Sequence, residues 1–369
     1  MQTEIKVNTL KKLAGKGQSP WYDNIDRRFI KNGHLKELFD NGILGVTSNP
    51  TIFEKAVAGS DEYDREIKEL AGQGKNSRQI YDILTVKDVS LAADLLKDTY
   101  KSSNHLDGYV SIEVLPEFAH NPEETIKSGR EIAAKIARPN IMIKVPGTKE
   151  APEAIRALVR EGINVNVTLL FSLEQYEICA TAYIEGLKDR LKEGRDIKNI
   201  FSVASIFVSR VDTKIDKILE DIGNEELKGK IAVSNAKVIY QSFKKLFGGE
   251  EFQGLKTKGA NVQRPLWAST STKNPVYSDV KYVEELIGAQ TINTIPPHTI
   301  DAFLDHGKTE LTVENQLDEA KSYLARLKAL GIDIDDICRQ TQDAGVKAFQ
   351  ASFDKLILSI EKKMNRLDT

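Results

Sequence analysis

Residues 140–148, NIMIKVPGT, place a single lysine inside a short apolar run that ends at a Pro-Gly pair. A run of this length and composition predicts a buried strand. Alternate side chains of a strand point to opposite faces, so Lys144 and Met142 share one face and the apolar residues beside them share the other. Burying an unpaired ammonium is costly, so the position of Lys144 near the end of a buried strand needs a chemical reason.

Apolar runs of the same kind recur along the chain and alternate with longer stretches of helical periodicity. They predict strands at residues 21–25, 43–48, 109–114, 140–145, 163–169, 201–206, 265–269 and 291–295. Strands that alternate with helices predict parallel βαβ units, and eight such units favour a closed (β/α)8 barrel, an α/β fold. The competing doubly wound sheet usually carries a glycine-rich first turn, and neither a G-x-G-x-x-G nor a P-loop pattern occurs.

Two parts of the chain exceed what a simple barrel needs. The gap at residues 51–107 is too long for one crossover and predicts extra helices after the second strand. The tail from about residue 312 has helical periodicity and predicts a last helix docked on the barrel. The apolar positions of that helix are Phe349, Phe353, Leu356, Ile360 and Met364. We expect a single barrel domain that spans residues 1–369.

The composition is that of an ordinary globular protein. The 369 residues are 40% hydrophobic and 29% charged, with a net charge of −2, which gives no electrostatic footprint for nucleic acid or an acidic membrane surface. No apolar run approaches the ~20 residues of a membrane span, and the first residues lack the apolar core of a signal peptide. We therefore expect a cytoplasmic protein. Cys179 and Cys338 form no disulfide framework, and the histidines lack metal-binding spacing.

Polar residues occupy the inward-facing positions toward the carboxyl ends of several predicted strands. They are Asp23 near the end of the first strand, Thr47 and Asn49 at the second, Glu113 in the third, Asn166 and Thr168 in the fifth, and Ser269 at the end of the seventh. The carboxyl ends of barrel strands form the face where active sites of this fold lie. Each residue alone could be a turn, a cap or a structural ion pair, but independent accidents would scatter over both ends. The shared location predicts one polar pocket around Lys144.

The residue types of this predicted pocket favour covalent catalysis by lysine. Burial in apolar surroundings favours the neutral amine, which attacks a carbonyl and forms a Schiff base that can accept electrons from a neighbouring C–C bond. The proton transfers need carboxylates, and Glu113 and Asp23 are the candidates. Arg210, after the sixth strand, could hold a phosphate-sized anion with Ser269 and Lys273. Both cations could equally be solvated surface charges.

Five sequence blocks stand in order along the chain: DNID, GVTSNPTIFEK, SIEV, IMIKVPGT and INVNVTLLFS, followed by SIFVSRVD. Each block alone is weak evidence, whereas their combination in this order is highly specific. On these blocks the chain resembles the transaldolases from about Trp21 to the C-terminal helix. The block WASTSTKNP and the total length resemble the longer bacterial form of that family.

The resemblance implies a class I, Schiff-base (β/α)8 enzyme of the pentose phosphate pathway. Such an enzyme moves a dihydroxyacetone unit from sedoheptulose 7-phosphate or fructose 6-phosphate to glyceraldehyde 3-phosphate or erythrose 4-phosphate, without a metal or organic cofactor. The alternatives are a fructose 6-phosphate aldolase that releases free dihydroxyacetone and an inactive barrel kept for binding. Phe207 matches the transaldolases, because the aldolases tend to carry a tyrosine there. The choice between monomer and homodimer stays open.

The resemblance also implies roles for individual residues. Lys144 forms the Schiff base with the donor's C2 carbonyl, and Asp23 takes the proton from the C4 hydroxyl. Glu113 and Thr168 hold a water that shuttles protons during carbinolamine dehydration. The implied substrate contacts are Asn49 and Asn166 for donor hydroxyls, Thr47 and Ser205 in the pocket lining, Arg210 for the phosphate and Ser269 as a second phosphate contact. Lys273 departs from the family pattern, since shorter members carry an arginine closer to the serine.

Overall fold

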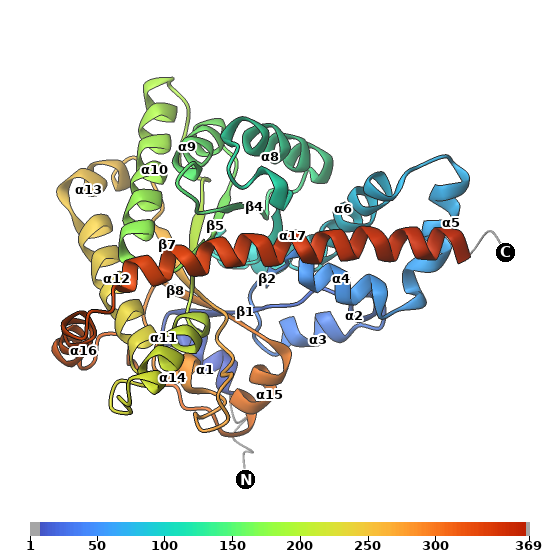
Figure 1. The fold of residues 1–369 in the computed structure, drawn as a ribbon. Helices are drawn as coiled ribbons and strands as arrows, with labels where there is room; N and C mark the ends of the chain where they lie inside the picture. Colours follow the sequence, from blue (N-terminus) through green and yellow to red (C-terminus); the bar gives the residue numbers. More distant parts are fainter. Residues whose placement is uncertain (1–7, 367–369) are drawn as a thin grey trace, which may run out of the picture.

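The structure, a computed structural model, describes residues 8–366 and contains a closed barrel of parallel strands (Figure 1). The strands are β1 (Gln18–Tyr22), β2 (Val46–Thr47), β3 (Val110–Glu113), β4 (Ile141–Pro146), β5 (Val165–Leu170), β6 (Ser202–Phe207), β7 (Gln263–Ala268) and β8 (Thr291–Ile295). Each strand pairs with the next one along the chain, and β8 closes the barrel on β1. The predicted (β/α)8 fold is confirmed.

The first strand begins earlier than its sequence predicts. β1 pairs in register with β8 from Gln18 to Tyr22, so Asp23 lies directly after the strand instead of inside it. The polar residues at its start are buried because the barrel supplies partners for them. The Gln18 side chain donates to the Leu286 carbonyl at 2.7 Å, and the Ser19 hydroxyl donates to Asp107 at 2.7 Å.

Helices surround the barrel and connect its strands (Figure 1). Outside the insertion and the C-terminal helix they are α1 (Thr9–Gly15), α2 (Arg27–Lys31), α3 (His34–Asp40), α8 (Pro122–Ile136), α9 (Ala151–Glu161), α10 (Leu173–Lys192), α11 (Ser209–Asp221), α12 (Ile231–Gly248), α13 (Glu250–Lys256), α14 (Lys281–Glu284), α15 (Pro297–His306) and α16 (Leu317–Ala329), with the 3-10 turn η2 (Pro116–Phe118). None of the helices between residues 8 and 366 has the length and apolarity to cross a membrane.

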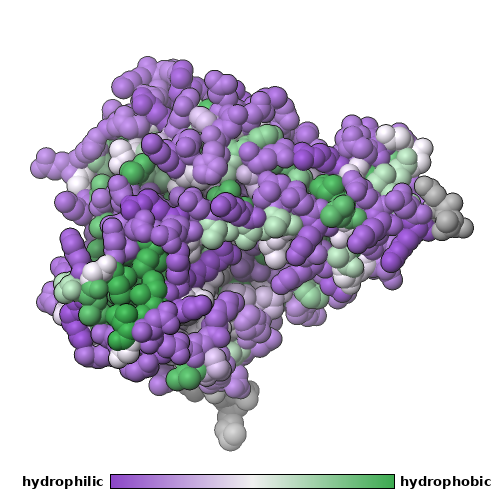
Figure 2. All heavy atoms as spheres, viewed as in Figure 1, coloured by the Kyte–Doolittle hydropathy of each residue, from purple (hydrophilic) through white to green (hydrophobic). Residues whose placement is uncertain are grey.

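The core lies between the strands and this layer of helices, and the face of the molecule shown in Figure 2 is mostly hydrophilic. Outward-facing strand residues such as Ile143, Val145 and Val167 are at most 1% exposed. Removing each large apolar side chain from water contributes about 1.5–3 kcal/mol to folding. The alternation predicted for β4 and β5 is confirmed, because the polar residues of these strands point into the barrel.

The predicted insertion and the predicted C-terminal helix are both present and pack together. The insertion contains α4 (Pro50–Ala58), η1 (Asp61–Tyr63), α5 (Asp64–Gly72), α6 (Ser77–Leu95) and α7 (Lys97–Ser102). The long helix α17 (Ile334–Arg366) crosses the molecule and packs against α4, α5 and α6 (Figure 1). Its residues Phe353, Leu356 and Ile360 are at most 1% exposed. Hydrophobic burial therefore holds the last helix on the barrel.

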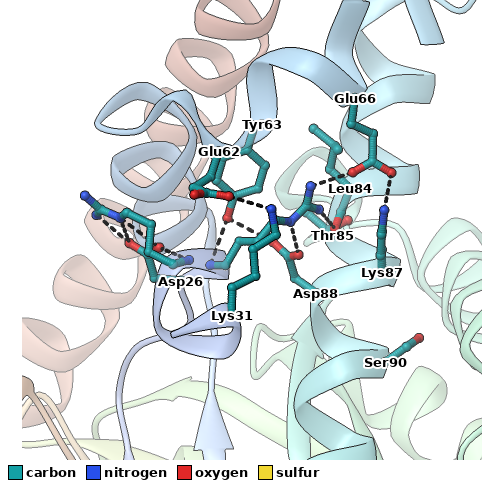
Figure 3. A network of polar contacts seen from close by, with 12 residues as sticks. Asp26, Lys31, Glu62, Tyr63, Glu66, Leu84, Thr85, Lys87, Asp88 and Ser90 are labelled. Carbon is teal, nitrogen blue, oxygen red and sulfur yellow. Dashed lines mark hydrogen bonds and ion pairs between the residues drawn. The ribbon is translucent and has the colours of Figure 1, made fainter. Parts of the chain in front are cut away.

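A buried ion-pair network joins the segment after β1 to the insertion (Figure 3). Arg27 is 2% exposed, and its Nε atom lies 2.6 Å from Oδ1 of Asp88 on α6. Its Nη1 atom lies 2.5 Å from Oε2 of Glu66 on α5. The Tyr63 hydroxyl donates to Asp88 at 2.9 Å. The turn that carries Asp23 is therefore anchored a few residues further along the chain.

We expect Arg27→Leu to lower the free energy of unfolding by about 3–5 kcal/mol, because it leaves the buried Asp88 without its counter-charge. The neighbouring Arg28 provides a matched control, since its side chain is 45% exposed and pairs with Asp26. Arg28→Leu should lose less than about 1 kcal/mol. Urea unfolding of both variants measures the two losses in free energy of unfolding. If Arg27→Leu loses no more than Arg28→Leu, the Arg27 network adds no stability beyond that of a surface ion pair.

Candidate active site

A cavity of about 550 Å³ lies among residues at or just beyond the carboxyl ends of the strands. Its lining includes nearly all of the residues predicted for the site, namely Asp23, Thr47, Asn49, Lys144, Thr168, Ser205, Arg210, Ser269 and Lys273. The volume suits a small-molecule ligand. Glu113 and Asn166 lie behind this lining, because they flank Lys144 in the register of β3, β4 and β5.

Lys144 is buried on β4 and reaches the cavity from the barrel interior. It is 4% exposed, and its Nζ atom donates to the Ser48 carbonyl at 3.0 Å. The same atom lies 3.7 Å from Oε2 of Glu113, a distance that makes an ion pair and not a hydrogen bond. The amine thus faces the cavity with a carboxylate on the neighbouring strand.

Glu113 is held where its carboxyl group readily gains and loses a proton. Burial raises the pKa of Glu113 to about 7, although the nearby Lys144 ammonium acts in the opposite direction. No described residue forms a hydrogen bond with either carboxyl oxygen of Glu113. The same holds for the hydroxyl of Thr168, which lies two strands away. Buried polar groups of this kind favour a bridging water. The arrangement suits a proton relay beside Lys144.

Asp23 occupies a different environment, directly after the end of β1. Its Oδ1 atom accepts a hydrogen bond from the Thr47 hydroxyl at 2.8 Å, and that hydroxyl also lies 2.5 Å from Oγ1 of Thr294. Burial raises the pKa of Asp23, while the charges of Lys144 and Arg210 oppose the rise. A carboxylate tuned in this way can accept a proton from a bound hydroxyl group.

The amide side chains sit in two different settings. On β5, the Asn166 Nδ2 atom donates to Ser111 at 2.9 Å, and the Ser205 hydroxyl donates to Asn166 Oδ1 at 2.7 Å. Asn49 is the N-cap of α4, where its Oδ1 accepts from the backbone of Ile52 at 3.0 Å. Capping fixes the Asn49 side chain and leaves its amide nitrogen to face the cavity as a donor.

Positive charge gathers at one end of the cavity. Arg210 begins α11 as predicted, and its guanidinium lies over the rings of Phe207 and Phe349, 5.0 and 5.9 Å from their centroids. Lys273 donates to the Ser271 hydroxyl at 2.8 Å. Burial lowers the pKa of Lys273, and the charge of Arg210 lowers it further. Desolvated cations that repel one another favour the binding of an anion.

Ser269 lies beside this cationic end on a strained backbone. Its φ of +56° is in the left-handed region, where residues other than glycine are uncommon. Its hydroxyl lies 2.9 Å from that of Ser209, which directly precedes Arg210. Strain of this kind collects at functional sites. The Ser209–Ser269 contact ties the loop after β7 to the start of α11.

The sequence reasoning missed several residues of the cavity. Lys55 lines it from α4 and is the last residue of the sequence block that contains Asn49. Its spacing of i+4 from Thr51, another lining residue, is a signal that could have identified it. Thr294 lines the cavity from β8, and Phe349 reaches it from α17. No local signal marks Phe349, because only the docking of α17 brings it there.

The described residues also limit what else this site can bind. Within 8–366, no three His, Cys, Asp or Glu side chains gather closely enough to hold a metal ion. The reactive groups are instead the amine of Lys144, the Asp23 carboxyl and the Thr168 hydroxyl in the cavity lining, with the Glu113 carboxyl behind it. The pKa values of both carboxyls are raised. Such a set supports Schiff-base chemistry on a carbonyl compound.

Comparison with known proteins agrees with this chemistry. A family model described as Transaldolase/Fructose-6-phosphate aldolase matches residues 20–360. The chain is 44% identical to the transaldolase of Trichodesmium erythraeum and 46% identical to transaldolase 2 of a Nostoc species, in each case over 98% of this chain and 99% of the relative. It is 43% identical to the transaldolase of Mycolicibacterium smegmatis, over 94% of both chains. The chain therefore belongs to the transaldolase family, and it is an enzyme of the transferase class.

Proposed function

We propose that this enzyme transfers a dihydroxyacetone unit from a ketose phosphate to an aldose phosphate through a Schiff base on Lys144. The observation that carries the proposal is the buried Nζ atom of Lys144, which faces the cavity 3.7 Å from Glu113. The donors are sedoheptulose 7-phosphate and fructose 6-phosphate, and the acceptors are glyceraldehyde 3-phosphate and erythrose 4-phosphate. Such sugars suit a cavity that is polar on one side and cationic at one end.

The first half of the proposed reaction builds the Schiff base. The neutral amine of Lys144 attacks the C2 carbonyl, a C–N bond forms, and the carbonyl oxygen becomes the hydroxyl of a carbinolamine. Glu113 then supplies a proton, through a water held with Thr168, so that this hydroxyl leaves as water and an iminium forms. A carboxyl with a pKa of about 7 is suited to this step, because both of its protonation states are populated near neutral pH.

The second half breaks and remakes a C–C bond. Asp23 accepts the proton of the C4 hydroxyl, the C3–C4 bond breaks, and its electron pair enters the iminium to give an enamine. The aldose phosphate leaves, an acceptor aldose phosphate enters, and Asp23 returns the proton as the new bond forms. Water then hydrolyses the new iminium, which releases the product ketose phosphate and restores the Lys144 amine. The burial that raises the pKa of Asp23 makes it a better base for this hydroxyl than an exposed carboxylate would be.

The remaining polar groups would hold the substrate in position. Asn49 contacts hydroxyl groups of the donor, and Thr47 fixes the Asp23 side chain. Asn166 lies behind the lining, so it acts through Ser205, from whose hydroxyl it accepts a hydrogen bond. Arg210, Ser269 and Lys273 bind the phosphate at the cationic end. Because the carbonyl and the phosphate of a sugar phosphate are joined by a short carbon chain, binding of the phosphate aligns C2 with Lys144.

We expect Arg210→Ala to raise KM for fructose 6-phosphate by about 10- to 100-fold, since a charge-assisted hydrogen bond contributes about 1.5–3 kcal/mol. For fructose, which has no phosphate, kcat/KM should hardly change. Arg28 lines the same cavity but pairs with Asp26. Arg28→Ala is therefore the control, with KM near that of the wild type. An equal loss for both donors after Arg210→Ala would contradict the phosphate role of Arg210.

We also propose that residues 8–366 form one domain and that the enzyme works in the cytoplasm on free sugar phosphates. The first seven and last three residues of the predicted domain lie outside the described residues. The single domain is supported by the contacts of both additions to the barrel, because the insertion contributes Lys55 and α17 contributes Phe349 to the same cavity. The near-neutral net charge of −2 suits small-molecule substrates.

A further inference from the structure

Gln342 on α17 makes two hydrogen bonds with the backbone at the barrel mouth. The side chain is buried, and its Nε2 atom donates to the carbonyl of Gly147 at 2.7 Å and to that of Leu169 at 2.8 Å. Gly147 directly follows the end of β4, and Leu169 directly follows Thr168 on β5. One side chain thus ties together the ends of the strands that carry Lys144 and Thr168.

The ends of β4 and β5 need additional hydrogen bonds, because the pairing of β5 with β6 is irregular at this point. The pairing of β5 with β6 shifts register between Val167 and Leu170. Leu169 has a φ of +58°, in the left-handed region that disfavours residues other than glycine. Backbone carbonyls displaced from a ladder still require donors. The backbone of Gly147 donates to the Thr168 carbonyl at 2.7 Å, and Gln342 supplies the donors for the two carbonyls on either side.

The same face of α17 also approaches Arg210. Gly345 lies one turn after Gln342, and a Cβ atom there would meet Leu169 Cδ2 at 3.0 Å and Arg210 Nη1 at 3.4 Å. One turn further, the Phe349 ring lies 5.9 Å from the Arg210 guanidinium. The close approach at Gly345 is what brings Gln342 within hydrogen-bond distance of the strand ends.

We infer that Gln342 is a positioning residue for catalysis. Its side chain holds the backbone that carries the Thr168 hydroxyl and links that backbone to the end of the strand that carries Lys144. The inference rests on the proposed role of Thr168 in carbinolamine dehydration. Gln342 touches no substrate and acts through the two carbonyl groups. Its effect is therefore on the rate of the chemical step and not on substrate affinity.

The test is the variant Gln342→Met, which keeps the length and bulk of the side chain and removes both donors. We expect kcat to fall by about 10- to 100-fold, since misplacing a catalytic group by an ångström is enough for such a loss. KM for fructose 6-phosphate should change by less than about threefold. The control is Thr341→Val, because Thr341 is equally buried on α17 but donates to the Ile337 carbonyl of its own helix. Its kcat should stay near that of the wild type.

Combining Gln342→Met with Thr168→Val separates positioning from general destabilisation. If Gln342 acts through Thr168, the double variant is no slower than Thr168→Val alone. If the fold-losses in kcat of the two single variants multiply in the double variant, the inference is overturned. A wild-type kcat in Gln342→Met, while Thr168→Val is slow, also overturns it. A wild-type kcat in Thr168→Val instead refutes the proposed role of Thr168 itself. Should Gln342→Met fail to fold, Gln342→Glu keeps the shape and repels both carbonyls, and the same pattern of losses is expected.

Discussion

Lys144→Ala is expected to abolish sugar transfer, with a loss in kcat of at least about 10⁴-fold, because no covalent intermediate can form without the amine. The fold should survive. Removing the ammonium leaves Glu113 without its ion-pair partner, but that carboxyl already has a pKa raised to about 7 and can take up a proton. Turnover measured with fructose 6-phosphate and erythrose 4-phosphate, alongside thermal unfolding, tests both parts of the prediction.

Borohydride trapping identifies the nucleophile directly. Reduction in the presence of fructose 6-phosphate, followed by peptide mapping, should place a stable adduct on Lys144 of the wild type and on no residue of Lys144→Ala. The cavity contains two other lysines, Lys55 and Lys273, so the experiment discriminates between real alternatives. Lys273→Ala is the matched control and should keep the adduct. An adduct on Lys55 or Lys273, or a Lys144→Ala variant with near-normal turnover, would overturn the mechanism.

Asp23→Asn is expected to lower kcat by about 10²- to 10⁴-fold, the usual contribution of a general base. Asparagine keeps an oxygen that can accept from the Thr47 hydroxyl, so the local geometry is retained. The Schiff base should still form, because Asp23 acts only after the iminium is in place. We therefore expect Asp23→Asn to show normal borohydride trapping but slow sugar transfer.

The control for this result is another aspartate of the same cavity. Asp26 lines the cavity and caps α2, and asparagine is an equally good cap, so Asp26→Asn should keep its kcat. Loss of trapping in Asp23→Asn would assign Asp23 to Schiff-base formation instead of C–C cleavage. A kcat near that of the wild type would mean that a different group removes the C4 proton.

Much of this architecture follows from local patterns in the chain. Alternation in β4 and β5 predicts that Lys144, Asn166 and Thr168 face the barrel interior. Lys144 and Thr168 line the cavity and Asn166 contacts the cavity residue Ser205, which confirms it. Alternation is informative because a shift of one residue would move every side chain to the other face. Helix caps are local in the same way, since the side chains of Asn121 and Ser172 accept from backbone N–H groups three residues further on, at the starts of α8 and α10.

The bounds of the first strand and the docking surface of the last helix did not follow from local patterns. The polar residues Gln18 and Ser19 do not resemble a buried strand, and they are buried because distant parts of the barrel satisfy their hydrogen bonds. The partners of Arg27 come from α5 and α6, well outside its own sequence neighbourhood. Propensity and periodicity describe a residue's near neighbours, so they carry no information about partners that arrive from elsewhere.

Gln342 and Phe349 are the clearest examples of this limit. The apolar spacing of residues 349–364 predicts a docked helix but not the surface on which it docks. That surface is set by the packing of α17 against α4 and by the close approach at Gly345. Short motifs and strand alternation, both local features of the sequence, therefore identify the reacting groups. Their exact placement depends on contacts between segments hundreds of residues apart, which exist only once the barrel has closed and the last helix has packed across it.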